Sequence, residues 1–379
     1  MQSNNRVIIA SAGSGKTTMI VNEAVDTDRK ILILTYTNDN LEEIRKKFIE
    51  KNGVIPQNVD IISWFSFLLR DGVRPYQNCI YDKKRISNIC FVNGQSTKGI
   101  AKDNIEKYYL KDGEYIYTDK LSSFVSECNK QTNGAVINRL AEIYEDLYID
   151  EVQDLAGYDL EIIELLLKSK MEITLVGDIR QATYTTNNSP KNKKYLGEKI
   201  YDFFKLCEKR NLCSIILKNE SYRCNQEICN LADSLYTLPS TISLNTIKTG
   251  HDGIFIVNSN DLKEYIEAYN PKILRYDKRT KVDSNNVLNF GQAKGLTFDR
   301  VLIIPNQTMK KYLSTANINY IEGSKAKVYV ALTRARYSVA FLYDKPCMLD
   351  NFKLWKNKKH PTSSTEITDN SLWRVKEKV

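Results

Sequence analysis

The stretch Arg6–Thr18, RVIIASAGSGKTT, decides the fold, because it joins a short apolar run to a glycine-rich turn and a helix start. Arg6–Ala10 has the length and β-branched composition of a buried strand. The turn after it matches the P-loop pattern, with Ala10 at the first glycine position. Small residues let successive backbone N–H groups surround a phosphate, and a helix N-terminus favours negative charge. The alternative, a turn without a ligand, is disfavoured by the flanking strand and helix.

Apolar runs of the same kind recur along the chain and alternate with helix-period stretches such as Asn40–Phe48 and Asp159–Leu167. Several runs are apolar almost continuously, as strands covered on both faces are. This alternation predicts an α/β fold with parallel sheets. The expected strands are Arg6–Ala10, Ile31–Leu34, Val59–Ile62, Leu147–Ile149, Ile173–Val176, Ser214–Leu217, Ile254–Val257, Lys272–Tyr276, Val287–Phe290, Val301–Pro305 and Val339–Tyr343.

The composition disfavours several classes of protein. Of 379 residues, 42% are hydrophobic, which suffices for sizeable cores. No apolar run approaches the roughly 18 residues of a membrane span. Eight cysteines without a CxxC pair and two histidines argue against secreted and zinc-dependent proteins. We therefore expect a cytoplasmic protein with reduced thiols and no membrane association. The net charge of +9 is compatible with nucleic-acid binding without requiring it.

Three polar segments interrupt or end the alternation. Residues 76–130 are lysine-rich and are expected to form a small helical insertion, and residues 185–194 a surface loop. The chain turns polar and irregular after about Pro346. The predicted domains are 1–75 with 131–205, the insertion 76–130, a second domain 206–345 and a C-terminal tail 346–379.

Two adjacent carboxylates end another apolar strand. Asp150 and Glu151 follow Leu147–Ile149, a position that suits a Mg²⁺ site. Asp150 would bind the ion directly or through a water ligand, and Glu151 would be the base that polarises the attacking water. Alone, the pair is better explained as a solvated acidic turn. Together with a P-loop in which Lys16 reaches the phosphates and Thr17 binds Mg²⁺, it predicts a nucleoside triphosphatase centre.

Seven motifs follow one another along the chain: ASAGSGKTT (10–18), LTYTN (34–38), IDEVQDL (149–155), LVGDIRQATY (175–184), SYRCN (221–225), AKGLTFDRV (293–301) and VYVALTRAR (328–336). In this order they resemble the motifs of the UvrD/Rep-type superfamily 1 DNA helicases, from residue 7 to about 343. The resemblance implies two RecA-like domains, with ATP and Mg²⁺ bound in the cleft between them. Tyr184 follows the GDxxQ motif without the Leu-Pro-Pro of RecD-type relatives, which favours the UvrD/Rep branch.

The resemblance also implies roles for individual residues. Gln181 would couple the γ-phosphate to the nucleic-acid site, Tyr222 would stack on adenine, and Arg223 and Arg334 would reach the γ-phosphate; a surface ion pair is the alternative for either arginine. The expected catalytic residues are Lys16, Asp150, Glu151, Gln181, Arg223 and Arg334. The expected ATP-binding residues are Ala12, Gly13, Ser14, Gly15, Lys16, Thr17, Thr18, Tyr222 and Gly295, with Thr17 and Asp150 as metal ligands.

For strand binding, the family uses aromatic and small polar residues, which stack on bases without sequence preference. Thr37 and Asn38 match its TN pair, and Trp64 lies in SWFSF, where TFHSF is common. A place in the core is the alternative for Trp64. The expected DNA-binding residues are Tyr36, Thr37, Asn38, Trp64 and Tyr184.

Departures from the family pattern concern contacts and size. Thr297 stands where relatives have a ribose-contacting Glu, and 67 residues separate Arg223 from Gly291, where relatives insert an accessory domain. We expect a compact, ATP-dependent 3′–5′ translocase or helicase acting on single-stranded DNA or tailed duplexes, in DNA repair or antiviral defence. The alternative is an ATP-responsive subunit of a multiprotein complex, for example with a nuclease partner, that unwinds little alone.

Overall fold

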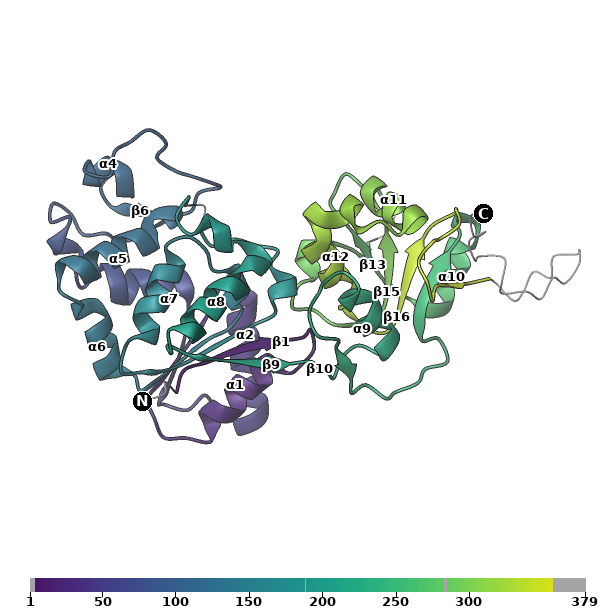
Figure 1. Ribbon diagram of the computed structural model, residues 1–379, viewed down its shortest axis with the longest axis horizontal. Helices are drawn as coiled ribbons and strands as arrows, with labels where there is room; N and C mark the ends of the chain where they lie inside the picture. The colour runs from purple at the N-terminus through teal and green to yellow at the C-terminus, as the bar shows by residue number, and fades with distance from the viewer. Residues whose placement is uncertain (1–3, 188, 283–284, 357–379) are drawn as a thin grey trace, which may run out of the picture. The chain divides into compact units, whose positions relative to one another are not determined.

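The computed structural model describes residues 4–187, 189–282 and 285–356 (Figure 1). The chain divides into two compact units. The first comprises Met1–Ala10 and Gly15–Lys218, and the second comprises Ser11–Ser14 and Asn219–Val379. Each unit contains a six-stranded sheet whose paired strands are all parallel. The predicted α/β fold with parallel sheets is confirmed.

The sheet of the first unit has the order β3-β2-β7-β8-β1-β9. Its inner strands are buried almost end to end, as their continuous apolar runs predicted. Because all six strands run in one direction, their carboxyl ends lie along one edge, the usual ligand-binding edge of such sheets. The strands are β1 (Arg6–Ala10), β2 (Ile31–Thr35), β3 (Val59–Ser63), β7 (Asp146–Ile149), β8 (Glu172–Gly177) and β9 (Ser214–Lys218).

Helices cover both faces of this sheet. The apolar sides of α1 and α2 join one core cluster with β1, β2 and β3, and α7 and α8 lie on the opposite side of the sheet from α1 (Figure 1). The side chain of Thr37 caps the N-terminus of α2, and Gly53 ends it in a left-handed conformation. The helices are α1 (Lys16–Val25), α2 (Asn38–Asn52), α3 (Trp64–Phe67), α5 (Leu121–Gln131), α6 (Ala135–Ile143), α7 (Asp159–Leu167) and α8 (Ile200–Lys209).

The insertion at residues 76–130 differs from the helical segment that the sequence predicted. It contains a small sheet in which β4 (Asn88–Cys90) is parallel to β6 (Tyr115–Tyr117) and β5 (Leu110–Lys111) is antiparallel to it. Only α4 (Ile105–Tyr109) and most of α5 are α-helical there. The tyrosines and β-branched residues of these strands suit a pleated surface, but the polar composition around them concealed the short strands.

A buried carboxylate joins the insertion to the core of the first unit. Asp159, at the start of α7, is 1% exposed. It accepts hydrogen bonds from the Trp64 indole N–H at 3.0 Å and from the hydroxyls of Ser122 and Thr186. Burial raises the pKa of Asp159, and these three donors oppose that rise. One side chain thus holds together α3, α5, α7 and the loop after β8.

We expect Asp159→Ala to lower the free energy of unfolding of the first unit by about 3 kcal/mol, because the buried donors of Trp64 and Ser122 lose their acceptor. Urea titration followed by tryptophan fluorescence measures this loss. Asp202→Ala is the matched control, because Asp202 pairs with Lys205 on the surface and such a pair contributes at most about 1 kcal/mol. Equal losses in the two variants would contradict the role of Asp159.

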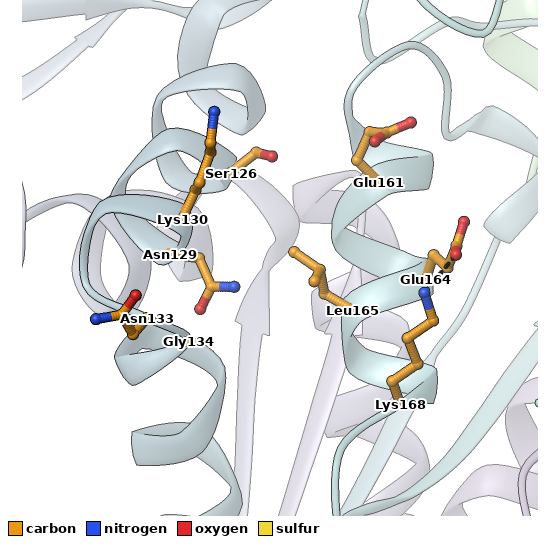
Figure 2. Close-up of a pocket in the computed structure, with 9 residues that line it drawn as sticks. All are labelled: Ser126, Asn129, Lys130, Asn133, Gly134, Glu161, Glu164, Leu165 and Lys168. Atoms are coloured by element: carbon orange, nitrogen blue, oxygen red, sulfur yellow. Dashed lines mark hydrogen bonds and ion pairs between the residues drawn. The ribbon is translucent and has the colours of Figure 1, made fainter.

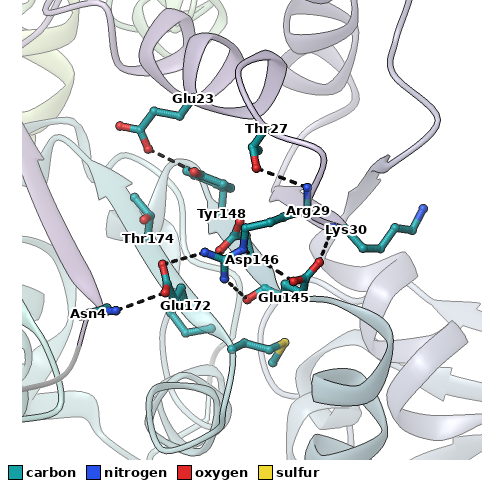
Figure 3. Close-up of polar contacts among 12 residues, drawn as sticks. Asn4, Glu23, Thr27, Arg29, Lys30, Glu145, Asp146, Tyr148, Glu172 and Thr174 are labelled. Carbon is teal, nitrogen blue, oxygen red and sulfur yellow. Dashed lines mark hydrogen bonds and ion pairs between the residues drawn. The ribbon is translucent and has the colours of Figure 1, made fainter. Parts of the chain in front are cut away.

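The amino-terminal ends of the strands carry an ion-pair network (Figure 3). Arg29, just before β2, lies 2.9 Å from Asp146 and 3.2 Å from Glu172, the first residues of β7 and β8. Lys30 donates its backbone N–H to Glu145, and Asn4 donates to Glu172. Opposite charges meet here across strand starts, so this edge of the sheet has a structural role.

The sheet of the second unit has the order β14-β13-β15-β16-β12-β17. One of its faces forms a core with α9, α11 and α12, and the other forms a core with α10. A separate parallel pair joins β10 (Glu220–Ser221) to β11 (Ile242–Ser243). The other elements are β12 (Gly253–Val257), β13 (Lys272–Arg275), β14 (Val287–Asn289), β15 (Phe298–Ile304), β16 (Ala335–Leu342), β17 (Lys353–Leu354), α9 (Gln226–Asp233), α10 (Leu262–Tyr269), α11 (Gln307–Thr315) and α12 (Lys325–Leu332).

Three predicted boundaries differ from the structure. Ser11–Ser14 lie within the predicted first domain, 1–75, but belong to the second unit. The sequence placed the start of the second domain at residue 206, but β9 pairs along its whole length with β1, and the first unit extends to Lys218. The predicted tail begins too early, because Lys353–Leu354 adds a strand beside β12. The rest of the predicted tail, residues 357–379, lies outside the described residues. No helix within the described ranges combines the length and apolar character needed to cross a bilayer.

An aromatic cluster surrounds the buried histidine of the second unit. The ring of His251 stacks 4.0 Å from Phe255 and 3.7 Å from Tyr269, and its Nε2 lies 3.0 Å from the Tyr265 hydroxyl. Burial and then the charge of Arg300 lower the pKa of His251 to about 4; Lys353 acts in the same direction and Asp252 opposes it. The imidazole is therefore neutral in the folded unit.

We expect the second unit to lose stability between pH 6.5 and pH 4. Below about pH 6.5 the unfolded chain protonates His251 while the folded unit keeps it neutral, so acid favours unfolding; above pH 6.5 the full stability remains. The free energy of unfolding should be about 2–3 kcal/mol lower at pH 4 than above pH 6.5 because of this one histidine. Urea titrations of wild type and His251→Phe at pH 7.5 and pH 4.5 isolate the contribution of His251 to this loss of stability. An equal acid-induced loss in both proteins would contradict this assignment.

Candidate nucleotide-binding site

The P-loop connects β1 to α1 through two glycines in the left-handed region. Gly13 has φ +75°, and Gly15, the N-cap of α1, has φ +77°; other residues rarely adopt these angles. Ser14 is buried, and its hydroxyl has no hydrogen-bond partner among the described residues. A buried hydroxyl without a partner, next to a helix N-terminus, fits a phosphate group. The predicted phosphate site thus has a suitable local geometry.

Three predicted residues meet where β1 and β7 end. The Thr17 hydroxyl donates to Asp150 Oδ2 at 3.1 Å, and the Glu151 backbone N–H donates to Asp150 Oδ1 at 2.9 Å. Burial raises the pKa of Asp150 to about 7, the Glu151 charge adds to this, and Lys16 opposes it. Two adjacent carboxylates at a buried edge favour a divalent cation, which would return Asp150 to its ionised form. Thr17 and Asp150 therefore suit the predicted Mg²⁺.

Gln153, which was not predicted as a site residue, links the ends of β7 and β8. Its side-chain amide N–H donates to the Glu151 carboxylate, and its amide oxygen accepts the Asp178 backbone N–H at 3.1 Å. Gly177 must lack a side chain, because a Cβ there would lie 2.3 Å from that oxygen. Gln153 therefore helps to orient Glu151, whose backbone is itself in the left-handed region at φ +59°. The DEVQD spacing was the available sequence signal.

Asp178, at the end of β8, connects this cluster to Gln181. It is fully buried and accepts hydrogen bonds from Gln181 Nε2 at 2.9 Å and from Arg180 Nε at 3.1 Å. Burial opposes its ionisation, but the charges of Arg180 and Lys16 hold the pKa of Asp178 below its usual value. The predicted coupling residue Gln181 is thus fixed next to the carboxylate cluster within the first unit.

Thr18 faces away from this cluster. Its side chain is exposed and accepts a hydrogen bond from Lys47 of α2 at 3.3 Å. Its predicted nucleotide contact remains a prediction.

Both predicted arginines of the second unit are held at Thr333. Arg223 donates to the Thr333 carbonyl at 3.2 Å, and Arg334 Nη2 lies 3.3 Å from the Thr333 hydroxyl. Arg334 is 1% exposed and also donates to the carbonyls of Val330 and Leu296. These contacts exclude the alternative of surface ion pairs for Arg334. Thr333 was not predicted as a site residue, although it lies in the ALTRA motif.

The remaining predicted residues of the second unit have suitable surroundings for their roles. Tyr222 is 62% exposed, which leaves ring surface for a base. Gly295 has φ +86° in the turn before Leu296, whose carbonyl binds Arg334. Within the same unit, the Tyr222 backbone N–H donates to the Gly13 carbonyl at 2.9 Å. Their contacts with a nucleotide remain predictions.

The predicted strand-binding residues fall into two groups. Tyr36 and Thr37 are partly exposed after β2, Asn38 is exposed at the start of α2, and Tyr184 is 43% exposed. Trp64, in contrast, is 1% exposed and donates its indole N–H to Asp159. It has no surface on which a base could stack, so the prediction that Trp64 binds DNA is wrong and its alternative, a place in the core, holds.

A surface pocket of about 380 Å³ lies elsewhere in the first unit, between α5 and α7 (Figure 2). Three of its four charged lining side chains form ion pairs: Lys168 lies 2.6 Å from Glu164, and Glu161 lies 3.5 Å from Lys191 outside the lining. It contains none of the predicted site residues. The candidate site is therefore the carboxyl edge of the sheet.

Lys16 and Thr17 of the P-loop motif, at the start of α1, and the cluster at the ends of β7 and β8 define the first unit as a P-loop nucleotide-binding domain. Two family models match the chain: an AAA domain over residues 1–187 and the viral superfamily 1 RNA helicase core domain over residues 117–343. The second match covers more than half of the chain. The protein belongs to the superfamily 1 helicase core family.

Curated relatives agree with the predicted UvrD/Rep resemblance, which is confirmed. The chain is 22% identical over 282 residues to the ATP-dependent DNA helicase Rep of Buchnera aphidicola subsp. Schizaphis graminum, covering 60% of this chain and 41% of Rep. It is 24% identical over 324 residues to the "Probable DNA helicase II homolog" of Mycoplasma capricolum subsp. capricolum, covering 70% and 42%. The chain thus spans about two fifths of the length of these relatives.

Similar solved structures are viral helicases. The PRRSV helicase matches with a TM-score of 0.44 at 14% identity, over 89% of this chain and 52% of that chain. Arterivirus nonstructural protein 10 (helicase) in complex with DNA matches with a TM-score of 0.47 at 12% identity, over 90% and 60%.

Proposed function

We propose that the chain is the ATP-hydrolysing core of a DNA helicase that moves 3′–5′ along single-stranded DNA. The observation that carries this proposal is the hydrogen-bonded cluster at the carboxyl edge of the first unit. The cluster joins Thr17, Asp150, Glu151, Gln153, Asp178 and Gln181 across the ends of three strands. It supplies in one place the groups that phosphoryl transfer to water requires.

Hydrolysis assigns a distinct task to each group. The P-loop N–H groups and Lys16 would bind the phosphates, and Glu151 would take a proton from the attacking water. Gln153 keeps the Glu151 carboxylate in one orientation. Thr17 and Asp150 would hold Mg²⁺, which supplies charge neutralisation on the phosphate oxygens.

The two arginines of the second unit would stabilise the charge that develops on the γ-phosphate. Their common anchor at Thr333 supports a shared role, because it holds both guanidinium groups at one turn of the second unit. The hydrogen bonds from Ser221 and Tyr222 to the carbonyls of Ala12 and Gly13 also support it, since they tie the Arg223 segment to P-loop residues of the same unit.

Coupling between ATP and DNA would pass through the segment after β8. Gln181 is bound to Asp178 at the nucleotide cluster, and Tyr184 follows three residues later with an exposed ring. A change in the hydrogen bonding of Gln181 on hydrolysis would therefore shift a base-stacking residue. Thr37 and Asn38, at the amino end of α2, would bind the phosphates of the same strand.

Unwinding assays with tailed duplexes test this function and its polarity. We expect ATP-dependent unwinding of a duplex with a 3′ single-stranded tail, none with a 5′ tail or blunt ends, and none by Lys16→Ala. Unwinding from the 5′ tail alone would refute the proposed polarity. DNA-stimulated ATP hydrolysis without unwinding of any substrate would favour the ATP-responsive subunit of a multiprotein complex.

A further inference from the structure

Three aromatic rings form a row that leads from the core of the first unit onto its insertion. Tyr36, after β2, contacts Phe65 edge to face with ring centroids 5.5 Å apart. Phe65, after β3, contacts Phe91 in the same manner at 5.9 Å. Phe91 follows β4 in the insertion. The row therefore begins at a predicted DNA-binding residue and ends at one to which the sequence analysis gave no role.

The ring of Phe91 is largely open to solvent. It is 72% exposed, whereas Phe65 beside it is 9% exposed. Burial of Phe91 contributes little to folding, because most of its apolar area stays in water. The loop that carries it is nevertheless held in place: Val92 N–H donates to the Thr118 hydroxyl at 3.2 Å, and Ser96 N–H donates to Asp119 at 3.1 Å. The ring is thus presented by an ordered loop.

The surroundings of Phe91 suit a polyanion better than a protein interface. Residues 91–102 contain two lysines and no aspartate or glutamate; Lys98 is exposed, whereas Lys102 is paired with Glu127 at 3.0 Å. Among the described residues of the insertion, Phe91 and Tyr115 are the exposed large hydrophobic side chains. A stable protein interface buries about 800 Å² on each partner, which a single aromatic ring does not provide. A nucleobase, in contrast, needs only one ring face.

We propose that Phe91 stacks on a base of the single strand that also contacts Tyr36, so that the insertion extends the DNA-binding surface. This inference rests on the proposed function. Base stacking on aromatic side chains is independent of sequence, which suits an additional contact for a protein that moves along DNA. The exposed ring of Phe91 and its edge contact with Phe65 define the point at which the strand would leave the core for the insertion.

Binding of a fluorescein-labelled oligothymidine to the full chain, measured by anisotropy, tests the inference. We expect Phe91→Ala and Phe91→Leu each to raise the Kd about five- to hundred-fold, and Phe91→Trp to keep it near the wild-type value. Leucine is apolar without an aromatic face, so it separates stacking from general apolar contact. Tyr115→Ala, also in the insertion, is the matched control with unchanged Kd.

A strand containing abasic positions sharpens the result, because stacking requires the base. We expect abasic DNA to bind wild type more weakly than intact DNA does and to reduce the difference between wild type and Phe91→Ala. If Phe91→Ala and Phe91→Leu bound DNA with wild-type affinity while Tyr36→Ala bound it more weakly, the inference about Phe91 would be overturned and the proposed function would stand. If wild type bound no single-stranded DNA, the proposed function would fail with it.

Discussion

Replacement of Glu151 by glutamine is expected to lower the rate of ATP hydrolysis by about 10²–10⁴-fold, the usual effect of removing a general base. Glutamine keeps the size of the side chain and still accepts the hydrogen bond from Gln153. It cannot take a proton from water. The loss should therefore appear in kcat, measured by phosphate release at saturating ATP and Mg²⁺, while ATP binding persists.

Glu161→Gln provides the matched control for this variant. Glu161 lies in the same unit at the pocket of Figure 2, where it pairs with Lys191 away from the carboxylate cluster. We expect its kcat to equal that of wild type. A Glu151→Gln protein that hydrolysed ATP at the wild-type rate would remove Glu151 from the mechanism and leave the cluster with a binding role only.

Replacement of Arg223 by alanine is expected to lower kcat by about 10³-fold or more, the range in which arginines act on transferred phosphoryl groups. A guanidinium group stabilises charge that is greater in the transition state than in bound ATP. The effect should therefore fall mainly on kcat. Arg223→Lys should recover only part of the rate, because an ammonium group lacks the planar fork of donors.

Arg336→Ala separates this role from a general loss of positive charge. Arg336 lies on β16 close to the Thr333 anchor, is half exposed and pairs with Asp299 at 3.1 Å. We expect the Arg336→Ala protein to hydrolyse ATP at the wild-type rate. Equal kcat values for Arg223→Ala and wild type would contradict the assignment of Arg223. The melting temperature of each variant shows whether the second unit is still folded.

Most strands of both sheets could be predicted from the sequence, because strands covered on both faces are continuous apolar runs. β1 matches its predicted range fully, and α7 was located to the residue. The apolar pattern of a strand does not, however, show to which of the two units the strand belongs. β9 carries the same apolar signal as the strands of the second unit, and only its pairing with β1 assigns it to the first.

The site was predictable where its chemistry depends on motif residues, and less so where it depends on burial. The Thr17–Asp150 contact follows from two motifs that come after β1 and β7, whose carboxyl ends lie at the same edge of the parallel sheet. Trp64 also lies in a motif position, but the buried Asp159 that binds its indole N–H is 95 residues away along the chain. Gln153 and Thr333 act through hydrogen bonds to other site residues. Both lie in recognisable motifs, but the motif alone does not show which residues their side chains and carbonyl groups contact.

The central claim is that the carboxyl edge of the first unit hydrolyses ATP in response to single-stranded DNA. Steady-state phosphate release by wild type and Lys16→Ala, with and without an oligothymidine of some tens of nucleotides, tests it most directly. We predict that DNA raises the wild-type rate at least ten-fold and that Lys16→Ala shows no hydrolysis in either condition. A wild-type rate that DNA leaves unchanged, or hydrolysis that survives in Lys16→Ala, would contradict the claim.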